Sequence, residues 1–539
     1  MCWGSRKRMI DITQTHIYPF PHKRMVRWKY YLASSISRHL PLLLVMQILV
    51  SHAFFTRPLP ACAPLKASLL SVRAARGIDG WQNDDAPRYR SRGVSANKHE
   101  VLGIVHDQGK KLYPASTSLY PQAFCKILPD MWSNDPEAAL VMHADGAGSK
   151  AALAYAYWRE TGDVSVWKGI AQDALVMNLD DVYCAGAWRA PCLVTSTIAR
   201  NRRLVPGLVV KHLIDGLEEV AEELRPWGVA VGMAGGETAD LGDQVRTLTV
   251  DCTLATRMAR ADVVDNGNIQ AGDWIVGLGS SGPPTKYEAS AADPGAKYNS
   301  GIGSNGLTAA RHDVLAPAVG KCYPETYDPA LQDTAYCGSR LLTDLVEIPG
   351  GRGTGQMTVG KLLLSPTRTY APFLAQLFES SRGIQDHIHG IVHCTGGGQT
   401  KVLRCLPPGR PVHVVKDALF PTPPVFQMIA QEQRKQGEGV WKEGVRWAQE
   451  GQKGKDTGIS EAWREMYQVF NMGHRMELYI GGGERHANTV IEMAEALGLT
   501  AKVVGHVEEE GGVNGGRHCL TVHHANVAKN GGTQKFVYT

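Results

Sequence analysis

Between residues 143 and 244 the chain carries three acidic segments that are flanked by glycine: HADGAGSK (143–150), QDALVMNLDDVYCAGA (172–187) and MAGGETADLGDQ (233–244). In the second segment, Asp173 and the pair Asp180–Asp181 stand about two helical turns apart in an otherwise apolar run. Carboxylates are rarely buried among apolar side chains unless they are paired or bound to a metal. The pattern therefore restricts this run to a fold that supplies the carboxylates with partners.

The three segments together predict a site for a magnesium-bound polyphosphate. Carboxylates are the hard oxygen ligands that Mg²⁺ takes beside phosphates, and neighbouring glycines let backbone N–H groups approach phosphate oxygens. Taken singly, Asp-Gly is a common turn, and two adjacent aspartates also occur on solvated helix faces. Glu237 precedes a strand-like run and is interpreted as a loop residue at a strand edge. The candidate oxygen ligands are Asp145, Asp173, Asp180, Asp181, Glu237 and Asp240.

Length and composition indicate a globular protein of two or more domains. The chain has 539 residues, an apolar share of 43% and a charged share of 20%. Its net charge is +5, but much of the basic excess lies ahead of residue 90, so composition gives no reason to expect nucleic acid binding. The 11 cysteines form no CxxC pair, which favours reduced, buried thiols over a zinc site or a disulfide framework.

The N-terminal segment is predicted to be a targeting presequence over residues 1–88. Residues 12–78 contain no Asp or Glu, and basic residues precede a short apolar run over 40–50. This run resembles a signal peptide, and the Phe54-Phe55 start of the next stretch resembles a transit peptide. The combination is similar to the bipartite presequences of algae with secondary plastids, which predicts a plastid location. A cytoplasmic or mitochondrial location, a start at Met25 and plain disorder remain as alternatives. No membrane association is expected of the mature chain.

The remaining chain alternates helix-like and strand-like segments, which predicts an α/β or α+β architecture in two domains, 89–265 and 266–539. Two loop insertions are expected near 283–297 and 431–460, the second as a mobile surface segment. Helices are predicted at 150–160 and 211–225, and strands at 192–198, 246–255 and 274–278.

The second half adds glycine-rich pieces of its own. They include GLGSSG (277–282), SGIGSNG (300–306), SPTR (365–368) and HCTGGGQTK (393–401). Backbone amides, hydroxyls and Lys401 converge at the last of these, which suits an anionic group, although a structural turn explains the glycines equally well. Arg368 is expected either to clamp a phosphate or carboxylate or to form a surface ion pair. Neither a dinucleotide-binding nor a P-loop pattern is present in the sequence.

The order of these motifs resembles that of phosphoribosylformylglycinamidine cyclo-ligase, also called aminoimidazole ribonucleotide synthetase. DGAGSK, D-x₃-MNLDD, GGETAD, GD-x₄-LGSSG, SNG-x₄-R, SPTR-x-Y, TGGG and FNMG-x-x-M follow one another over roughly residues 89–508. The spacing before SNG is similar to the longer variant of Bacteroidetes-type bacteria. The resemblance implies two α/β domains, of which the first pairs with its twin around a β-barrel, so a homodimer is expected.

The resemblance also implies an ATP-dependent enzyme of purine (IMP) biosynthesis. Formylglycinamidine ribonucleotide would be phosphorylated on its formyl oxygen and then closed to aminoimidazole ribonucleotide, with release of ADP and phosphate. ATP and Mg²⁺ are the implied cofactors, and a requirement for K⁺ is left open. Asp145, Lys150, Asp181 and Glu237 are the expected catalytic residues, and Asp145, Asp173 and Asp181 the expected metal ligands. The expected nucleotide- and substrate-binding residues are Asp145, Gly146, Gly148, Lys150, Asp173, Gly235, Gly236, Glu237, Thr238, Ser304, Asn305, Gly306, Gly396, Gly397 and Gly398.

Two departures from the family pattern bear on these expectations. The family histidine before Ser-Asn-Gly is replaced by Gly303, with His312 and His393 as candidate substitutes. After TGGG, Gln399-Thr400-Lys401 stands where Asn-Leu-Pro-Arg is common. The alternatives are another ATP-dependent synthetase or kinase of the same superfamily, such as selenophosphate synthetase or thiamine-monophosphate kinase, and a nucleotide-binding regulatory protein without chemistry.

Overall fold

The computed structural model describes the chain from Ala86 onward, with gaps. The described residues are 86–95, 118–288, 298–331, 334–350, 353–380, 383–437, 457–512, 515–525 and 533–539. The chain divides into two compact units, Met1–Asp79 and Gly80–Thr539, and all described residues belong to the second. Most of the predicted presequence therefore lies outside the described residues. In the described ranges, no helix combines the length and apolar character that a membrane crossing requires.

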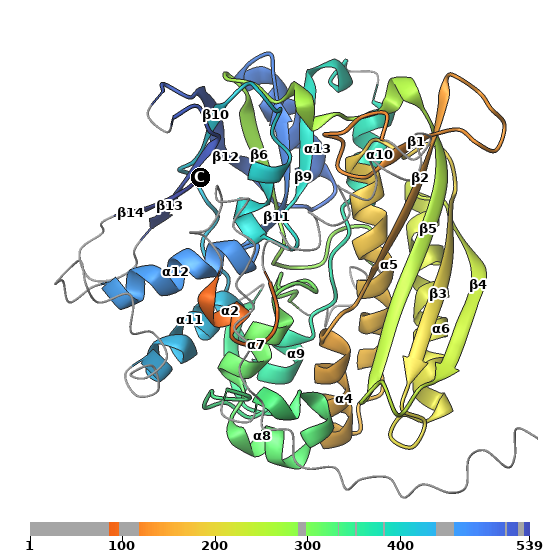
Figure 1. Cartoon of the computed structure of the whole chain (residues 1–539), viewed down its shortest axis with the longest axis vertical. Coiled ribbons are helices and arrows are strands. Elements are labelled where there is room, and N and C mark those ends of the chain that lie inside the picture. The colour runs from red at the N-terminus through yellow and green to blue at the C-terminus, as the bar shows by residue number, and fades with distance from the viewer. Residues whose placement is uncertain are drawn as a thin grey trace, which may run out of the picture. The chain divides into compact units, whose positions relative to one another are not determined.

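The first sheet has five strands, and helices pack against one of its faces. Its strand order is β1-β2-β5-β3-β4, with β1 Ile127–Pro129, β2 Ala138–Gly146, β5 Leu248–Ala259, β3 Cys192–Arg200 and β4 Val231–Asp240. The strands β3 and β4 are parallel, and β5 runs antiparallel to β2 and β3. Strand β5 alternates buried and more exposed residues, which is typical of a sheet with one face packed and one face open. The helices α5 (Val166–Cys184) and α6 (Gly207–Leu224) cover the packed face (Figure 1).

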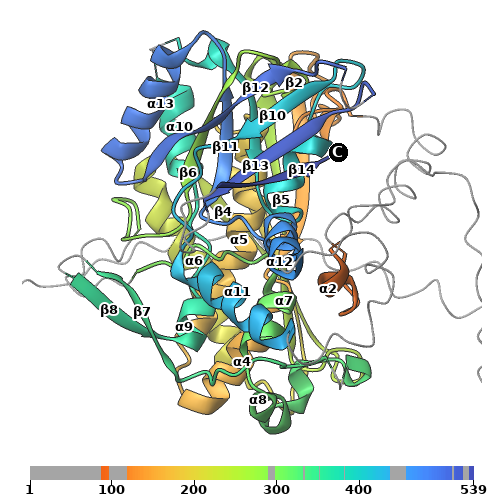
Figure 2. The same ribbon diagram turned by 90° about the vertical axis from the view of Figure 1, so that its left-hand side faces the viewer.

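The second sheet has seven strands in the order β14-β13-β10-β12-β6-β11-β9. In Figure 2 its strands lie together at the top of the view, while the separate hairpin of β7 and β8 lies below them. The strands are β6 Trp274–Gly279, β7 Leu345–Gly350, β8 Gly353–Thr358, β9 Ile388–His393, β10 Val412–Lys416, β11 His474–Ile480, β12 Ala501–Glu509, β13 Cys519–Ala525 and β14 Thr533–Tyr538. The remaining helices are α2 Pro87–Arg90, α4 Lys150–Thr161, α7 Leu307–Val314, α8 Pro317–Cys322, α9 Val359–Leu363, α10 Ala371–Glu379, α11 Pro424–Gly437, α12 Thr457–Val469 and α13 Glu484–Ala496.

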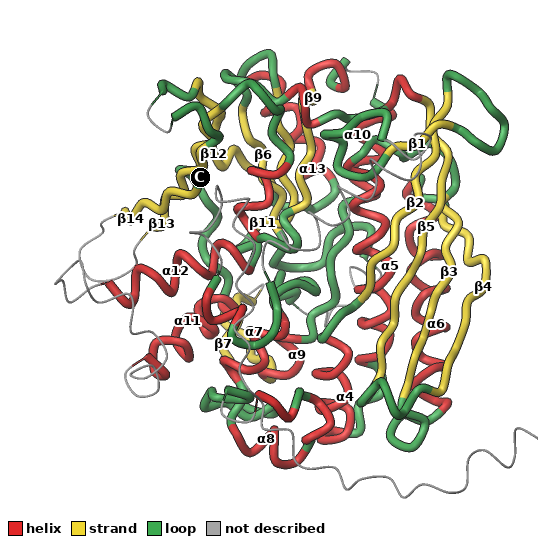
Figure 3. The backbone as a smooth tube through the Cα atoms, in the orientation of Figure 1, coloured by secondary structure: helices red, strands yellow, loops and turns green. Residues whose placement is uncertain are grey.

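Helix α5 connects the two sheets because it is buried on all sides. It packs against β2 and β5 of the first sheet, and α10 and β9 from the second half also contact it. Sixteen of its 19 residues are buried, including three aspartates. A helix that is apolar around its whole circumference belongs inside a larger core, and Figure 3 shows α5 between the five-stranded sheet and the loops of the second half.

The predicted α/β architecture is confirmed, as are the predicted helices and strands, with ends shifted by a few residues. One local interpretation is wrong: GGETAD is not a loop, because β4 runs through it to Asp240 as an edge strand. The strand register shifts between Val194 and Ser196, and Gly235 has a φ of 94° there, so a bulge takes up the glycines. Residues 431–437 end α11 and are not part of a surface loop, while 438–456 lie outside the described residues.

The N-terminal boundary predicted after residue 88 falls inside α2. Arg88 Nη2 lies 2.9 Å from Asp313 Oδ1, and Arg92 Nη2 lies 2.5 Å from the same oxygen. Asp313 is fully buried, and these arginines outweigh the effect of burial, so its pKa is lowered. Residues 86–95 therefore supply the counter-charge of a buried carboxylate, and experiments on this protein need them in place.

Candidate active site

A buried ion pair joins the start of α4 to the middle of α5. Lys150 and Asp173 are both fully buried, and Lys150 Nζ lies 2.9 Å from Asp173 Oδ1. The ammonium also donates to the backbone oxygens of Gly303 (3.0 Å) and Ser365 (2.7 Å). An ammonium has three N–H donors, and these three contacts use all of them. Lys150 thus ties α5 to two loops of the second half, and its predicted contact with polyphosphate stays a prediction.

The SPTRTY segment binds two aspartates of α5. Asp173 Oδ1 accepts from Thr367 N (2.8 Å) and Thr367 Oγ1 (2.6 Å), and Asp180 Oδ1 accepts from Thr369 Oγ1 (2.6 Å) and Tyr370 N (3.0 Å). Burial raises the pKa of both carboxyl groups, and the neighbouring donors and cations oppose this shift. These hydrogen bonds join two motifs that lie almost two hundred residues apart in the chain.

Arg368 binds a carboxylate inside the protein. It is 2% exposed, and it donates to the backbone oxygens of Ser281 and Pro283 and pairs with Glu288. The guanidinium therefore holds the turn that follows GLGSSG. The predicted clamp on a carboxylate is confirmed, with Nε and Nη2 each 3.2 Å from one oxygen of Glu288, and the alternative of a surface ion pair is wrong because Arg368 is buried.

Asp181 lies between two histidines, one from each half of the protein. Its Oδ1 lies 2.6 Å from His393 Nδ1, and its Oδ2 lies 3.3 Å from His143 Nε2. Burial by itself raises the pKa of Asp181, but the hydrogen bond from His393, together with His143 and Lys401, lowers it below its usual value. Asp181 therefore contacts basic side chains from both halves.

Hydrogen bonding fixes the orientation of His393. Arg475 can only donate, and its Nε lies 3.1 Å from His393 Nε2, so that nitrogen accepts and Nδ1 carries the proton toward Asp181. Arg475 also lies 5.0 Å from the Tyr370 ring and 3.8 Å from Asp180 Oδ2. Both ring nitrogens of His393 are thus used within the protein. His312, the other candidate substitute, is fully buried against Tyr336, and burial lowers its pKa to about 2.

The carboxylates of the first sheet have a different environment. Asp145 and Glu237 are exposed, at the end of β2 and within β4. Strand register places Gly146, Asp251, Thr197 and Glu237 in one row across the sheet. A Cβ on Gly146 would lie 1.9 Å from Asp251 Oδ1, so the glycine is needed for this close approach. Burial and then the charge of Asp145 raise the pKa of Asp251, which indicates carboxylates that repel one another.

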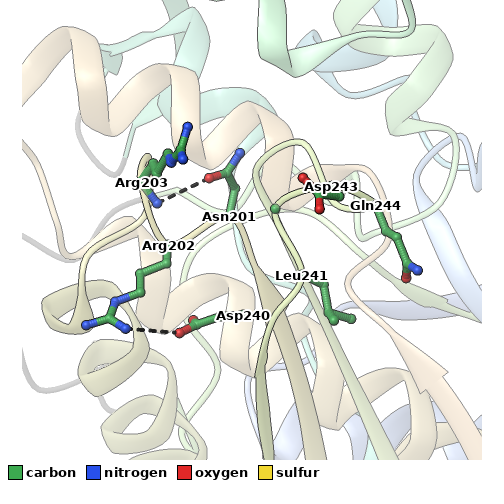
Figure 4. Close-up of a pocket in the computed structure, with 8 residues that line it drawn as sticks. Asn201, Arg202, Arg203, Asp240, Leu241, Asp243 and Gln244 are labelled. Carbon is green, nitrogen blue, oxygen red and sulfur yellow. Dashed lines mark hydrogen bonds and ion pairs between the residues drawn. The ribbon is translucent and has the colours of Figure 1, made fainter.

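A hollow of about 680 Å³ lies beyond the ends of β3 and β4 (Figure 4). Its lining residues are Asn201, Arg202, Arg203, Asp240, Leu241, Gly242, Asp243 and Gln244. Asp240 is paired with Arg200 at 2.8 Å and with Arg202 at 3.7 Å. Asp240 is the one predicted oxygen ligand among the lining residues, and it is already matched by arginine.

The glycine-rich loops of the second half face each other. Asn305 Nδ2 lies 3.9 Å from the position that a Cβ on Gly396 would take. Ser304 Oγ and Asn305 Oδ1 are buried and have no hydrogen-bond partner among the described residues. Buried polar atoms are rarely left without a partner, so these two atoms suit a polar ligand. Lys401 lies 5.3 Å from the Phe124 ring and is close enough to lower the pKa of Asp181.

The structure brings some of the predicted residues together and separates others. Lys150, Asp173 and Asp181 lie along α4 and α5, whereas Gly235, Gly236, Glu237 and Thr238 lie on the edge strand β4. Across the described ranges, no three His, Cys, Asp or Glu side chains form a group that could hold a metal ion. The metal site of Asp145, Asp173 and Asp181 therefore stays a prediction, and Asp173 already uses Oδ1 for Lys150 and Thr367.

Three residues of this region were not predicted from the sequence. His143 lies two positions before Asp145 in a strand, so both side chains point to the α5 side, and this alternation was a usable signal. Arg475 stands inside the FNMGHRM segment, but nothing local indicates that its partners are His393 and Asp180. Asp251 lies on an ordinary alternating strand, and only strand pairing brings it to Gly146.

Comparison with known proteins confirms the resemblance that the motif order predicts. Residues 126–258 match the family model described as AIR synthase related protein, N-terminal domain. A protein of Acetivibrio thermocellus named phosphoribosylformylglycinamidine cyclo-ligase is 26% identical over 374 residues, which is 69% of this chain and 82% of the relative. A protein of the same name from Methanocaldococcus jannaschii is 25% identical over 378 residues, covering 70% of this chain and 81% of the relative.

Solved structures show a more distant likeness. The crystal structure of the protein tt0281 from Thermus thermophilus aligns with 76% of this chain and 93% of its own, at 13% identity and a TM-score of 0.39. At this level the likeness supports no statement about ligands or activity. The relatives named above are called cyclo-ligases, which are enzymes.

Proposed function

We propose that this protein closes the imidazole ring of formylglycinamidine ribonucleotide in purine biosynthesis. ATP transfers its γ-phosphoryl group to the formyl oxygen, and ADP leaves. The amidine nitrogen then attacks the same carbon, phosphate leaves with that oxygen, and aminoimidazole ribonucleotide remains after loss of a proton. The observation that carries the proposal is that the motifs shared with cyclo-ligases interlock: SPTRTY binds α5, and the TGGG loop faces Ser304-Asn305.

The charge distribution supports a cation-bound nucleotide at the open end of the first sheet. Burial and then the charge of Asp145 raise the pKa of Asp251, so ionising both carboxyl groups is costly there. A bound Mg²⁺ would relieve this repulsion and would neutralise phosphate charge during transfer. Asp145, Asp251 and the exposed Glu237 are the residues that we assign to this cation and its nucleotide, with Asp181 as a further ligand. Whether K⁺ is also required is tested by measuring turnover with and without K⁺ in the presence of Mg²⁺.

The second half supports a substrate with polar groups. Ser304 Oγ and Asn305 Oδ1 are buried and without a partner in the described structure, and Gly396 of the TGGG loop lies next to Asn305. Because both nitrogens of His393 are occupied, we assign His393 to orienting Asp181. In a reaction where phosphate is already a good leaving group, positioning of the reacting groups contributes much of the rate acceleration.

Substrate choice tests the proposal against the alternatives. The full chain is incubated with Mg·ATP and either formylglycinamidine ribonucleotide or thiamine monophosphate, and ADP and the aminoimidazole product are measured. We expect ADP and aminoimidazole ribonucleotide in equal amounts from the first substrate and no ADP above background from the second. ADP formation only with thiamine monophosphate would identify a kinase of the same superfamily. Binding of ATP without product from either would favour a regulatory protein.

We also propose a homodimer that forms through the open face of the first sheet. Met142 on β2 and Leu193 on β3 are 56% and 54% exposed, and both pair with Ala255 of β5 in the same row. Exposed apolar side chains on an open sheet face are typical of an interface, and a second copy offers a matching surface. Light scattering of the full chain and of a Met142→Glu/Leu193→Glu variant tests this: we expect a dimer and a monomer, respectively, and a monomeric parent would contradict it.

We further propose import into a plastid, which rests on the acid-free sequence of residues 12–78. A fusion of residues 1–79 to a fluorescent protein, expressed in an alga with a secondary plastid, tests the location. Plastid fluorescence is expected, and a replacement of Phe54 by alanine is expected to stop import at an earlier compartment. Cytoplasmic or mitochondrial fluorescence would contradict the proposal.

A further inference from the structure

Gln399 occupies a position where this chain departs from the cyclo-ligase pattern, and its side chain is fully buried. Its Nε2 donates to the backbone oxygens of Asn471 (2.6 Å) and His474 (3.1 Å). Its Oε1 accepts from Lys416 Nζ at 2.9 Å. Both ends of the amide are therefore used, and they connect the TGGG loop to the FNMG loop, which lies more than seventy residues further along the chain.

Asn471 continues this connection to the loop that carries Ser304 and Asn305. Its Nδ2 donates to Gly301 O (2.8 Å) and Ile302 O (3.3 Å). Its Oδ1 accepts from Ser280 Oγ at 2.9 Å and from Gly473 N at 3.0 Å. Two amide side chains, Gln399 and Asn471, thus link the glycine-rich loops of the second half into one hydrogen-bonded unit.

A buried ion pair fixes Gln399 from behind. Lys416 Nζ lies 2.5 Å from Glu477 Oε1, both side chains are fully buried, and Lys416 also donates to the Gln399 backbone oxygen at 2.9 Å. His474 Nε2 (2.8 Å) and Tyr479 OH (2.9 Å) complete the hydrogen bonds of Glu477. Burial alone would raise the pKa of Glu477, but the charge of Lys416 and the His474 hydrogen bond lower it to about 2. A pair held this way has little freedom to move, so the amide it binds is also fixed.

The TGGG loop contacts the FNMG segment on one side and the SNG loop on the other. Gly398 has a φ of 50°, and a Cβ there would lie 2.6 Å from the backbone oxygens of Phe470 and Tyr467, so the loop is pressed onto the FNMG segment. On the other side, Asn305 approaches Gly396 while its Oδ1 and the Oγ of Ser304 have no partner in the described structure. The Gln399–Asn471 link therefore joins the segments that hold the TGGG and SNG loops next to each other.

We propose that Gln399 is a positioning residue that holds the TGGG and SNG loops at the spacing needed to bind the phosphate-bearing ribose of the substrate. Backbone amides, hydroxyls and the nearby Lys401 are the donors that recognise a sugar phosphate. The identity of the substrate rests on the proposed function, whereas the binding of a sugar phosphate does not. Gln399 itself touches no ligand in this account and acts only through the two loops.

The test compares three full-length variants with the parent. Gln399→Met keeps the volume and removes the amide, and Gln399→Glu keeps the shape but directs a carboxylate at two carbonyl oxygens. The matched control is Gln433→Met, because Gln433 is another buried amide and bonds Asp313 at 2.8 Å, at the far end of α7 from Asn305. Thermal unfolding, the KM values for formylglycinamidine ribonucleotide and ATP, and the calorimetric Kd for ribose 5-phosphate are measured for each.

Both Gln399 variants are expected to raise the ribonucleotide KM and the ribose 5-phosphate Kd roughly tenfold, with less than about a twofold change in the KM for ATP. The control is expected to lower the unfolding temperature comparably without these shifts. Equal shifts in Gln433→Met, or unchanged Kd in both Gln399 variants, would overturn the inference. A parent that lacks turnover but shows the ribose 5-phosphate pattern would refute the proposed function and leave the positioning role of Gln399 supported.

Discussion

The acidic side chains of α5 and those of the first sheet differ in how their charge is balanced. Asp173 and Asp180 are fully buried and are matched by Lys150, by Thr367 and by Thr369. Asp145 and Glu237 are exposed on the sheet, and Asp145 raises the pKa of its neighbour Asp251. The difference teaches that motif carboxylates serve two purposes here: Asp173 and Asp180 of α5 hold the two halves together, and those of the sheet lie where they can attract a cation.

The largest effect is expected from breaking the buried pair on α5. Lys150→Met leaves Asp173 buried without its counter-charge, which typically costs about 3–5 kcal/mol of unfolding free energy. The matched control is Lys168→Met, because Lys168 pairs with Glu219 on the surface, where such a pair contributes about 1 kcal/mol or less. Urea denaturation measures both, and equal losses for the two variants would remove the distinction between scaffold and surface charges.

A second test uses the opposite pKa shifts of adjacent aspartates. Ionising Asp180 opposes folding as pH rises from its unfolded value of 3.8 through its raised folded pKa. Asp181 has a lowered folded pKa, so its ionisation stabilises the fold above 3.8 and this contribution is lost as pH falls through the folded value. At pH 7, Asp180→Asn is therefore expected to keep or raise the unfolding free energy, and Asp181→Asn to lower it by roughly 1–3 kcal/mol.

The measurement for this pair is urea unfolding at pH 7 and at successively lower pH. The difference between the two variants should shrink first as pH falls through the raised folded pKa of Asp180 toward 3.8, and again below 3.8 as Asp181 takes up its proton. A larger loss from Asp180→Asn than from Asp181→Asn at pH 7 would show that the balance of charge along α5 has been assigned to the wrong residue.

The smallest effect on stability is expected on the sheet. Glu237→Gln removes an exposed charge on an edge strand, so the unfolding free energy should change by less than about 0.5 kcal/mol. Affinity for Mg·ATP, measured by calorimetry, should fall roughly tenfold because a cation ligand is lost. Glu218→Gln on the exposed face of α6 is the control for a change in net charge alone. Unchanged affinity for Mg·ATP would show that Glu237 does not bind the nucleotide or its cation.

Much of the fold was predictable from the sequence because its elements follow local patterns. The run around Asp173 is apolar with acids at helical spacing, and it forms α5; Cys192–Arg200 alternates and forms β3. The strand β4 was not predicted, because its glycines and exposed side chains are typical of loops and only pairing with β3 makes it a strand. Local sequence also does not show that the first sheet ends in an open face.

The site was predictable as a set of motifs but not as a set of contacts. The sequence marks Asp181, yet its two histidines come from β2 and β9, and the pairing depends on how the halves pack. Lys150 looks like a phosphate ligand beside glycines, and only the fold shows that Asp173, Gly303 and Ser365 use its three donors. Long-range partners of this kind carry no local signal in a single sequence.

Turnover by Asp181→Asn tests the central claim most directly, namely that Asp181 belongs to the chemistry while its buried neighbours belong to the scaffold. Formation of aminoimidazole ribonucleotide from formylglycinamidine ribonucleotide and Mg·ATP is measured for the full chain, for Asp181→Asn and for Asp180→Asn. The account predicts turnover in the parent, a loss of roughly a hundredfold or more in Asp181→Asn and a much smaller loss in Asp180→Asn. Undiminished turnover in Asp181→Asn would contradict it.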